Sequence, residues 1–313
     1  MRLDLLAALS GALIALQARA NGELSHRLDN GLQAALVSFS SGLLIILIIT
    51  PFSPHIKEGT RNLKTAIAHK EIARWKLFAG ALGGSFVAIQ TQIVPLIGVA
   101  IYSVASIAGQ TAMSLFVDRI GLTGGGKKLI SPRRVIAAVL TVLAVLVSVW
   151  DRIDANNLSM IAVTAGCIAG AVVGVQRALN GQINEHSHQS FTTSLLNFIT
   201  GTSFLVILIL IAIALGENEL SPLPAGPWWI YTGGVIGVIY IAFTSTVVQH
   251  LGVLTFTLFS VGGQLAASLI IDLVSPTDGA SLSAYLVVGL AMTYVGVIAG
   301  GVSSSRVQKP KRR

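Results

Sequence analysis

Long apolar runs separated by short polar segments are the dominant pattern of this chain. A membrane-crossing helix needs about 20 mainly apolar residues to span a hydrocarbon core about 30 Å thick. Lipid offers no partner to backbone N–H and C=O groups, so each run should be helical. The pattern therefore predicts an all-α integral membrane protein with ten transmembrane helices, at 3–20, 32–52, 75–96, 99–117, 134–150, 158–178, 191–215, 228–249, 252–272 and 282–302.

The composition agrees with this prediction. Apolar residues make up 53% of the chain, charged residues only 11%, and the mean hydropathy is +0.77. A soluble domain carries roughly a quarter charged residues, because its whole surface must be solvated. A chain this poor in charge is expected to place most of its surface against the lipid bilayer.

The basic residues indicate an orientation rather than a nucleic-acid partner. The formal net charge is +8, but lysine and arginine cluster in segments between the apolar runs and in the last ten residues. With the N-terminus inside, 18 of the 21 lysines and arginines fall on the inner side or at inner helix ends. Because positive charge marks cytoplasmic segments of membrane proteins, we expect both termini to be cytoplasmic.

Two stretches of the first half recur in the second half. "QARANGEL" at 17–24 returns as "QRALNGQI" at 176–183, and "GQTAMSLFVD" at 109–118 returns as "GQLAASLIID" at 263–272. Each half holds five predicted spans, and an odd number makes the second half enter the membrane from the opposite side. We therefore predict two inverted five-helix repeats, residues 1–150 and 151–303, followed by a basic cytoplasmic tail at 304–313. Inverted repeats are typical of carriers that expose a midplane site to each side in turn.

The same stretches resemble a known family. "ALQARANGELSHRL", "GGSFVAIQTQIVPLIGVA" and "AGQTAMSLFVDRIGLTGGGKKLISPRRV" are similar to the YdcZ-like inner-membrane exporters of the drug/metabolite transporter superfamily, which includes the EamA-like transporters. The second half lacks the Ser-Pro-Arg-Arg entry to its last helix. The resemblance implies a ten-helix transporter of a bacterial inner (plasma) membrane, and it supplies neither a substrate nor functional residues.

Gln110 and Gln264 are the first candidates for a substrate site. Each is predicted near the middle of its span, where an amide finds no water. In one interpretation they bond each other or nearby carbonyls and hold two helices together, for about 0.6–2 kcal/mol. In the other they line a central cavity and offer a donor and an acceptor to a polar solute.

A second polar set lies on the first and sixth helices. Gln17, Arg19 and Asn21 are predicted at the outer end of one, and Gln176, Arg177 and Asn180 at the inner end of the other. The amides are candidate solute ligands, and the two arginines are candidates for gating or attracting a solute at each mouth. The alternative is that both arginines extend to lipid headgroups.

The third helix adds Gln90 and Gln92 before Pro95, a polar patch that suits either a cavity lining or bonds between helices. No acidic residue is predicted at the middle of a span, where a proton-coupled exporter is expected to keep one. Nor does the sequence contain a convincing catalytic set or metal-ligand cluster, so we expect no enzyme activity and no cofactor or metal.

These features favour a secondary transporter that moves a small polar metabolite or drug-like solute, with export the expected direction. An uncoupled channel or facilitator is the alternative, and a membrane scaffold is a weaker one. A pore needs a continuous polar file, whereas this chain offers isolated amides. The oligomeric state stays open, with a homodimer among the possibilities.

Overall fold

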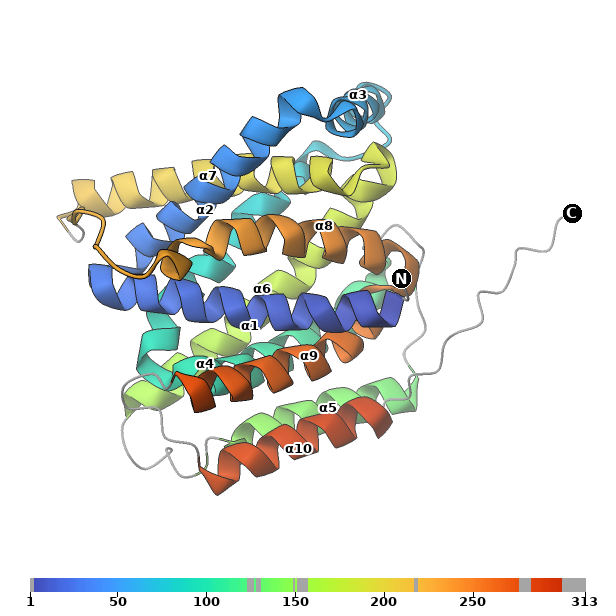
Figure 1. The fold of residues 1–313 in the computed structure, drawn as a ribbon. Helices are drawn as coiled ribbons and strands as arrows, with labels where there is room; N and C mark the ends of the chain where they lie inside the picture. Colours follow the sequence, from blue (N-terminus) through green and yellow to red (C-terminus); the bar gives the residue numbers. More distant parts are fainter. Residues whose placement is uncertain are drawn as a thin grey trace, which may run out of the picture.

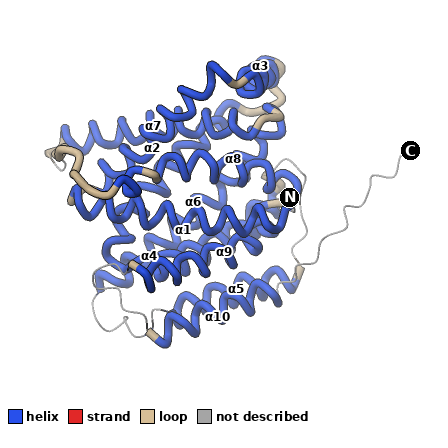
Figure 2. The backbone as a smooth tube through the Cα atoms, in the orientation of Figure 1, coloured by secondary structure: helices blue, strands red, loops and turns tan. Residues whose placement is uncertain are grey.

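The computed structural model describes residues 3–122, 127, 131–148, 150, 157–216, 219–275 and 283–299, and within these ranges every regular element is helical (Figures 1 and 2). The α-helices are α1 (Leu3–Leu28), α2 (Gly31–Ile49), α3 (Pro54–Ala68), α4 (Ala79–Ile120), α5 (Pro132–Ser148), α6 (Asn157–Ser187), α7 (Ser190–Ala214), α8 (Gly233–Leu251), α9 (Val253–Val274) and α10 (Ala284–Ala299). Short 3-10 helices lie at Thr50–Phe52 (η1), Arg74–Phe78 (η2) and Trp228–Tyr231 (η4). The expected tail at 304–313 lies outside the described residues.

Seven helical segments of the described chain are long and apolar enough to cross a membrane. One of them, Arg74–Ile120, contains two of the predicted spans, and the shorter apolar helices α5 and α10 lie side by side at one edge of the bundle (Figure 1). Large apolar side chains such as Leu44, Val139 and Leu210 are exposed on the outer helix faces. An apolar exterior of this kind is suited to lipid, as expected for an integral membrane protein.

A glycine breaks the backbone at the same place in each half. Gly98 interrupts α4 with φ 79° and ψ 166°, and Gly252 separates α8 from α9 with φ 83° and ψ 163°. This conformation is essentially restricted to glycine, because a Cβ would clash with the backbone. The two glycines are 154 residues apart and lie where the sequence predicts a boundary between spans.

After these breaks, the second part of α4 and α9 run antiparallel and cap each other. Asp118 Oδ1, near the end of α4, accepts a hydrogen bond from the backbone N–H of Val253 at 3.2 Å. Asp272 Oδ2, near the end of α9, accepts one from the backbone N–H of Ala100 at 2.8 Å. A carboxylate beside the first turn of a helix satisfies a free N–H and complements the helix dipole.

Glycines also set two close helix crossings. A Cβ added to Gly11 of α1 would lie 1.9 Å from the Ser260 oxygen of α9, and one added to Gly170 of α6 would lie 1.9 Å from the Ser106 oxygen of α4. From the other side of each crossing, a Cβ on Gly263 of α9 would meet the Ala8 oxygen of α1 just as closely. A Cβ on Gly109 of α4 would likewise meet the Cys167 oxygen of α6. Backbones therefore touch directly at the α1–α9 and α4–α6 crossings.

Two features differ from the predicted spans. An amphipathic helix, α3, occupies the basic segment after the second span, with Ile56 and Leu63 buried and Lys57 and Arg61 exposed. It lies at the same end of the bundle as the start of α1 (Figure 1). In addition, α1 and α6 continue eight or more residues beyond their predicted ends at 20 and 178.

Candidate functional site

The greater length of α1 and α6 places the polar set that they carry well before the end of each helix. Arg177 lies ten residues before the end of α6, which is about 15 Å along the axis. Gln17, Asn21, Gln176 and Asn180 are likewise buried, with at most 5% exposure. These residues are therefore enclosed by neighbouring helices, and their placement at the two membrane mouths stays a prediction.

Around α1 the amides join three helices. Gln17 Nε2 donates to the Gly233 oxygen of α8 at 3.1 Å, and Asn21 Nδ2 donates to Gln90 Oε1 of α4 at 3.3 Å. Asn21 Oδ1 and Gln90 Nε2 are buried and have no hydrogen-bond partner within the described chain. Asn21 therefore retains a free acceptor and Gln90 a free donor among the described residues.

Around α6 the corresponding amides form a more complete network. Gln176 Nε2 donates to Asn197 Oδ1 of α7 at 3.0 Å, and Asn197 Nδ2 donates to Asn180 Oδ1 at 2.6 Å. Asn197 was not predicted as a site residue. The available signal was its position 159 residues after Ser38, a second buried polar residue with the same offset that relates Gln17 to Gln176.

Gln110 and Gln264 are both fully buried in the antiparallel α4–α9 pair. Gln110 Nε2 donates to Ser106 Oγ of its own helix at 2.8 Å, whereas Gln110 Oε1 and both polar atoms of Gln264 have no partner among the described residues. The two amides are not bonded to each other. Because Ser114 Oγ faces Thr257 Oγ1 at 3.2 Å, the helix register sets the two glutamines within about 5 Å of each other along the axis.

Arg177 points into the bundle, and its side chain is 1% exposed, so it does not extend to lipid headgroups. Its Nε donates to the Tyr240 hydroxyl at 2.9 Å and its Nη1 donates to Thr257 Oγ1 at 3.0 Å. The guanidinium also lies over the rings of Phe256 and Tyr240, at 4.9 and 6.0 Å. The hydroxyl contact between Thr257 and Ser114 links this arginine to α4, one turn from Gln110.

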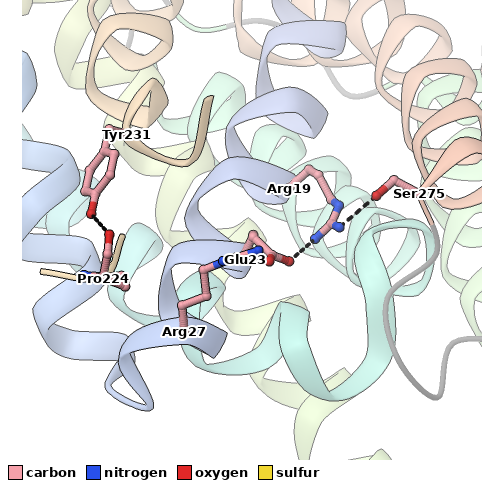
Figure 3. Close-up of polar contacts among 6 residues, drawn as sticks. All are labelled: Arg19, Glu23, Arg27, Pro224, Tyr231 and Ser275. Carbon is pink, nitrogen blue, oxygen red and sulfur yellow. Dashed lines mark hydrogen bonds and ion pairs between the residues drawn. The ribbon is translucent and has the colours of Figure 1, made fainter. Parts of the chain in front are cut away.

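Arg19 has a different environment, because it is neutralised (Figure 3). Its Nη1 donates to Glu23 at 3.0 Å and its Nη2 to the Ser275 hydroxyl at 2.9 Å, and Glu23 also accepts from Arg27 at 2.7 Å. The guanidinium lies 5.4 Å from the Trp229 ring and borders an apolar pocket of about 340 Å³ beside the end of α9. These contacts tie α1 to the end of α9.

Gln92 is separate from the other amides. Its side chain is exposed and lines a polar pocket of about 570 Å³ together with Asp29, Asn30 and Ser221, at the turn between α1 and α2. A segment before η4 is held over this turn, because Gln33 Nε2 donates to the Ser221 oxygen at 2.6 Å and Gln33 Oε1 accepts from the Ser221 N–H at 2.9 Å. Gln90 and Gln92 therefore do not form one patch.

The buried carboxylates of the described chain, Asp118 and Asp272, both lie at helix ends, where they cap another helix. No cluster of histidine, cysteine or acidic residues in the described ranges has the arrangement of a metal site. The chemistry of the interior is thus that of neutral amides and hydroxyls around one arginine.

The comparisons with known proteins are consistent with these features. A family model described as "Putative inner membrane exporter, YdcZ" matches residues 3–147 and 161–299. A solved structure titled "Crystal structure of protein" has a similar fold, with a TM-score of 0.63 and 12% sequence identity over 98% of each chain. Among curated proteins none matches the sequence.

Proposed function

Because the chain belongs to the YdcZ family of inner membrane exporters, we propose that it is a secondary transporter for a small polar solute that works by alternating access. The family and the apolar helices make it a multi-pass membrane protein of the transporter class. Transport, rather than catalysis, is the function that this membership indicates. The solute and the alternating mechanism are the parts that we propose.

In this proposal the chain crosses the membrane ten times, as two inverted units at 1–150 and 151–303, with both termini in the cytoplasm. The single observation that carries it is the pair of reciprocal caps, Asp118 on Val253 and Asp272 on Ala100. They support a pseudo-two-fold relation between the halves, because each cap repeats the other at the opposite end of the α4–α9 pair. Two equivalent ends can open alternately at similar free energy.

We propose that the solute binds beside the α4–α9 pair. Gln90, Gln110 and Gln264 are buried and retain polar atoms without partners. Leaving such groups unpaired costs about 1–3 kcal/mol each, which a solute with complementary donors and acceptors would recover. Gln17, Asn21, Gln176 and Asn180 would border the same space, whereas Gln92 and Arg19 would act near the outer mouth.

The first experiment is thermal unfolding of the purified protein in detergent against a library of polar metabolites and cationic drugs. The wild type and the Gln110→Ala/Gln264→Ala double variant are compared. A ligand that binds only the folded protein raises its Tm in proportion to the logarithm of its concentration above Kd. We expect at least one solute that stabilises the wild type and not the double variant.

A channel is separated from a carrier by counterflow of that solute in proteoliposomes. Saturable exchange that is accelerated by solute on the far side supports alternating access. Flux that rises linearly with concentration and shows no such acceleration would instead establish a channel or facilitator. Equal stabilisation of wild type and double variant would move the site away from Gln110 and Gln264.

A further inference from the structure

Arg177 is a buried cation whose hydrogen-bond partners are all neutral. Tyr240 and Thr257 each accept one N–H from the guanidinium, and Phe256 supplies the nearest ring face. Nη2 is fully buried and has no hydrogen-bond partner within the described chain. Only two of the five guanidinium N–H groups are thus used in these bonds, and both on Nη2 remain available.

No carboxylate of the described residues lies within 4.0 Å of Arg177, in contrast with Arg19 and its partner Glu23. The interior carboxylates Asp118 and Asp272 hold the N–H groups of Val253 and Ala100. Removing an ion from water costs several kcal/mol unless an opposite charge and hydrogen bonds compensate. Cation–π contacts return only about 1–2 kcal/mol of this cost.

Helix packing in this protein does not by itself require an arginine at this depth. The position related to Arg177 by the 159-residue offset is Ala18, a buried residue without charge. The aromatic pair related to Tyr240 and Phe256 by the 154-residue offset is Phe86 and Tyr102, whose rings lie 6.3 Å apart. The second half of the chain therefore has a buried arginine at a position where the first half packs an alanine.

We propose that Arg177 binds an oxyanion, a carboxylate or a phosphate group, carried by the solute. Arginine suits this task because its planar N–H groups match the two oxygens of such an anion. The rings of Phe256 and Tyr240 flank the guanidinium and would contact an apolar part of the same molecule. This inference rests on the transport function proposed above and narrows its solute to small organic anions.

The test uses four ring compounds of similar shape and different charge: benzoate, phenyl phosphate, benzamide and benzamidine. Each is titrated against the purified full-length protein in detergent, and Tm is measured at constant ionic strength. We expect benzoate, phenyl phosphate or both to raise Tm, whereas neutral benzamide and cationic benzamidine do not. A response to only one of the two anions identifies which oxyanion the site takes.

Arg177→Gln is expected to lower the affinity for the anion by about 10- to 100-fold, because one or two charged hydrogen bonds are lost. Arg61→Gln, the same change on the exposed face of α3, should leave the affinity at the wild-type value. If Arg177→Gln does not accumulate, Arg177→Lys replaces it, because lysine keeps the charge but loses the planar N–H pair. An anion that binds Arg177→Gln as tightly as wild type, a preference for benzamidine, or no response to either anion overturns the proposal.

Uptake of the radiolabelled compounds into proteoliposomes separates this proposal from the transport function. Arg177-dependent binding of an anion without any uptake would support the oxyanion site and refute transport of that anion. Saturable uptake of benzamide or benzamidine that is unchanged in Arg177→Gln would support the transport function and refute the oxyanion site.

Discussion

Asp118 Oδ1 lies 3.2 Å from the backbone nitrogen of Val253, so a residue near the end of α4 in one half of the chain caps the first turn of α9 in the other half. The counterpart bond, from Ala100 to Asp272, closes the same pair of helices at its far end. The two bonds fix the register of α4 against α9, and the polar interior is aligned by that register.

Asp118→Ala should lower the free energy of unfolding by about 1–2 kcal/mol, because the first turn of α9 loses its cap. Asp118→Asn keeps an acceptor and is expected to cost less. The measurement is thermal or denaturant unfolding in detergent, with Glu58→Ala on the exposed face of α3 as the control. A loss no larger than that of Glu58→Ala would show that the cap contributes little to stability.

Gly170→Ala should destabilise the protein by about 1–3 kcal/mol or more, because the new methyl group would meet the Ser106 backbone at 1.9 Å. The same change at Gly174, one turn later on α6, meets Met113 Cβ and Cγ at 3.2 Å and the Gln110 oxygen at 3.6 Å, and is expected to be far milder. Tm values of the two variants provide the comparison. Equal losses would mean that the α4–α6 crossing tolerates a wider separation than the structure shows.

Sequence reasoning predicted long apolar helices because lipid imposes a minimum apolar length on each span, and the described chain has seven helical segments of this kind. It predicted span boundaries at 96–99 and 249–252, and the backbone breaks at Gly98 and Gly252 lie within these boundaries. It ended α1 and α6 too early, because it treated the polar residues after Gln17 and Gln176 as interfacial. A helix whose polar face is covered by neighbouring helices can continue through such residues. The helix α3 was not predicted because its apolar positions are interspersed with charged residues and are too few for a membrane span.

The candidate site was predictable in part. The repeat identified the buried amides, but it could not identify their partners, because Asn197, Tyr240 and Thr257 approach from helices distant in sequence. The sequence does, however, separate Arg19, which has a carboxylate partner, from Arg177, which has none among the described residues. That difference depends on Glu23, which lies one turn beyond Arg19 on the same helix, whereas α6 has Gln182 at the equivalent position.

Gly252→Ala tests the backbone break between α8 and α9. At φ 83° and ψ 163° a Cβ is strained by about 1–3 kcal/mol, so the variant should unfold at a lower temperature. Gly98→Ala, the related change within α4, is expected to cost a similar amount. Gly237→Ala is not a suitable control because it would crowd Gln17, so Gly174→Ala serves again. A stable Gly252→Ala protein would indicate that the break relaxes to an ordinary helix.

The last prediction contrasts two buried amides that have opposite hydrogen-bonding status. Both polar atoms of Gln264 lack partners in the described chain, whereas Asn197 bonds both Gln176 and Asn180. Gln264→Met preserves the side-chain length and removes an unpaired polar group, so stability should stay level or rise by about 1 kcal/mol. Asn197→Ala leaves two buried groups unpaired and should cost about 2 kcal/mol or more.

The two variants are therefore expected to separate stability from solute handling. If Gln264 serves the solute, Gln264→Met will fold at least as well as wild type and yet lose most of its counterflow activity. Unfolding in detergent and counterflow in proteoliposomes are measured on the same preparations. A Gln264→Met protein that loses stability together with activity would assign this glutamine to helix packing, and the solute would then have to be held by the Asn21–Gln90 group between α1 and α4.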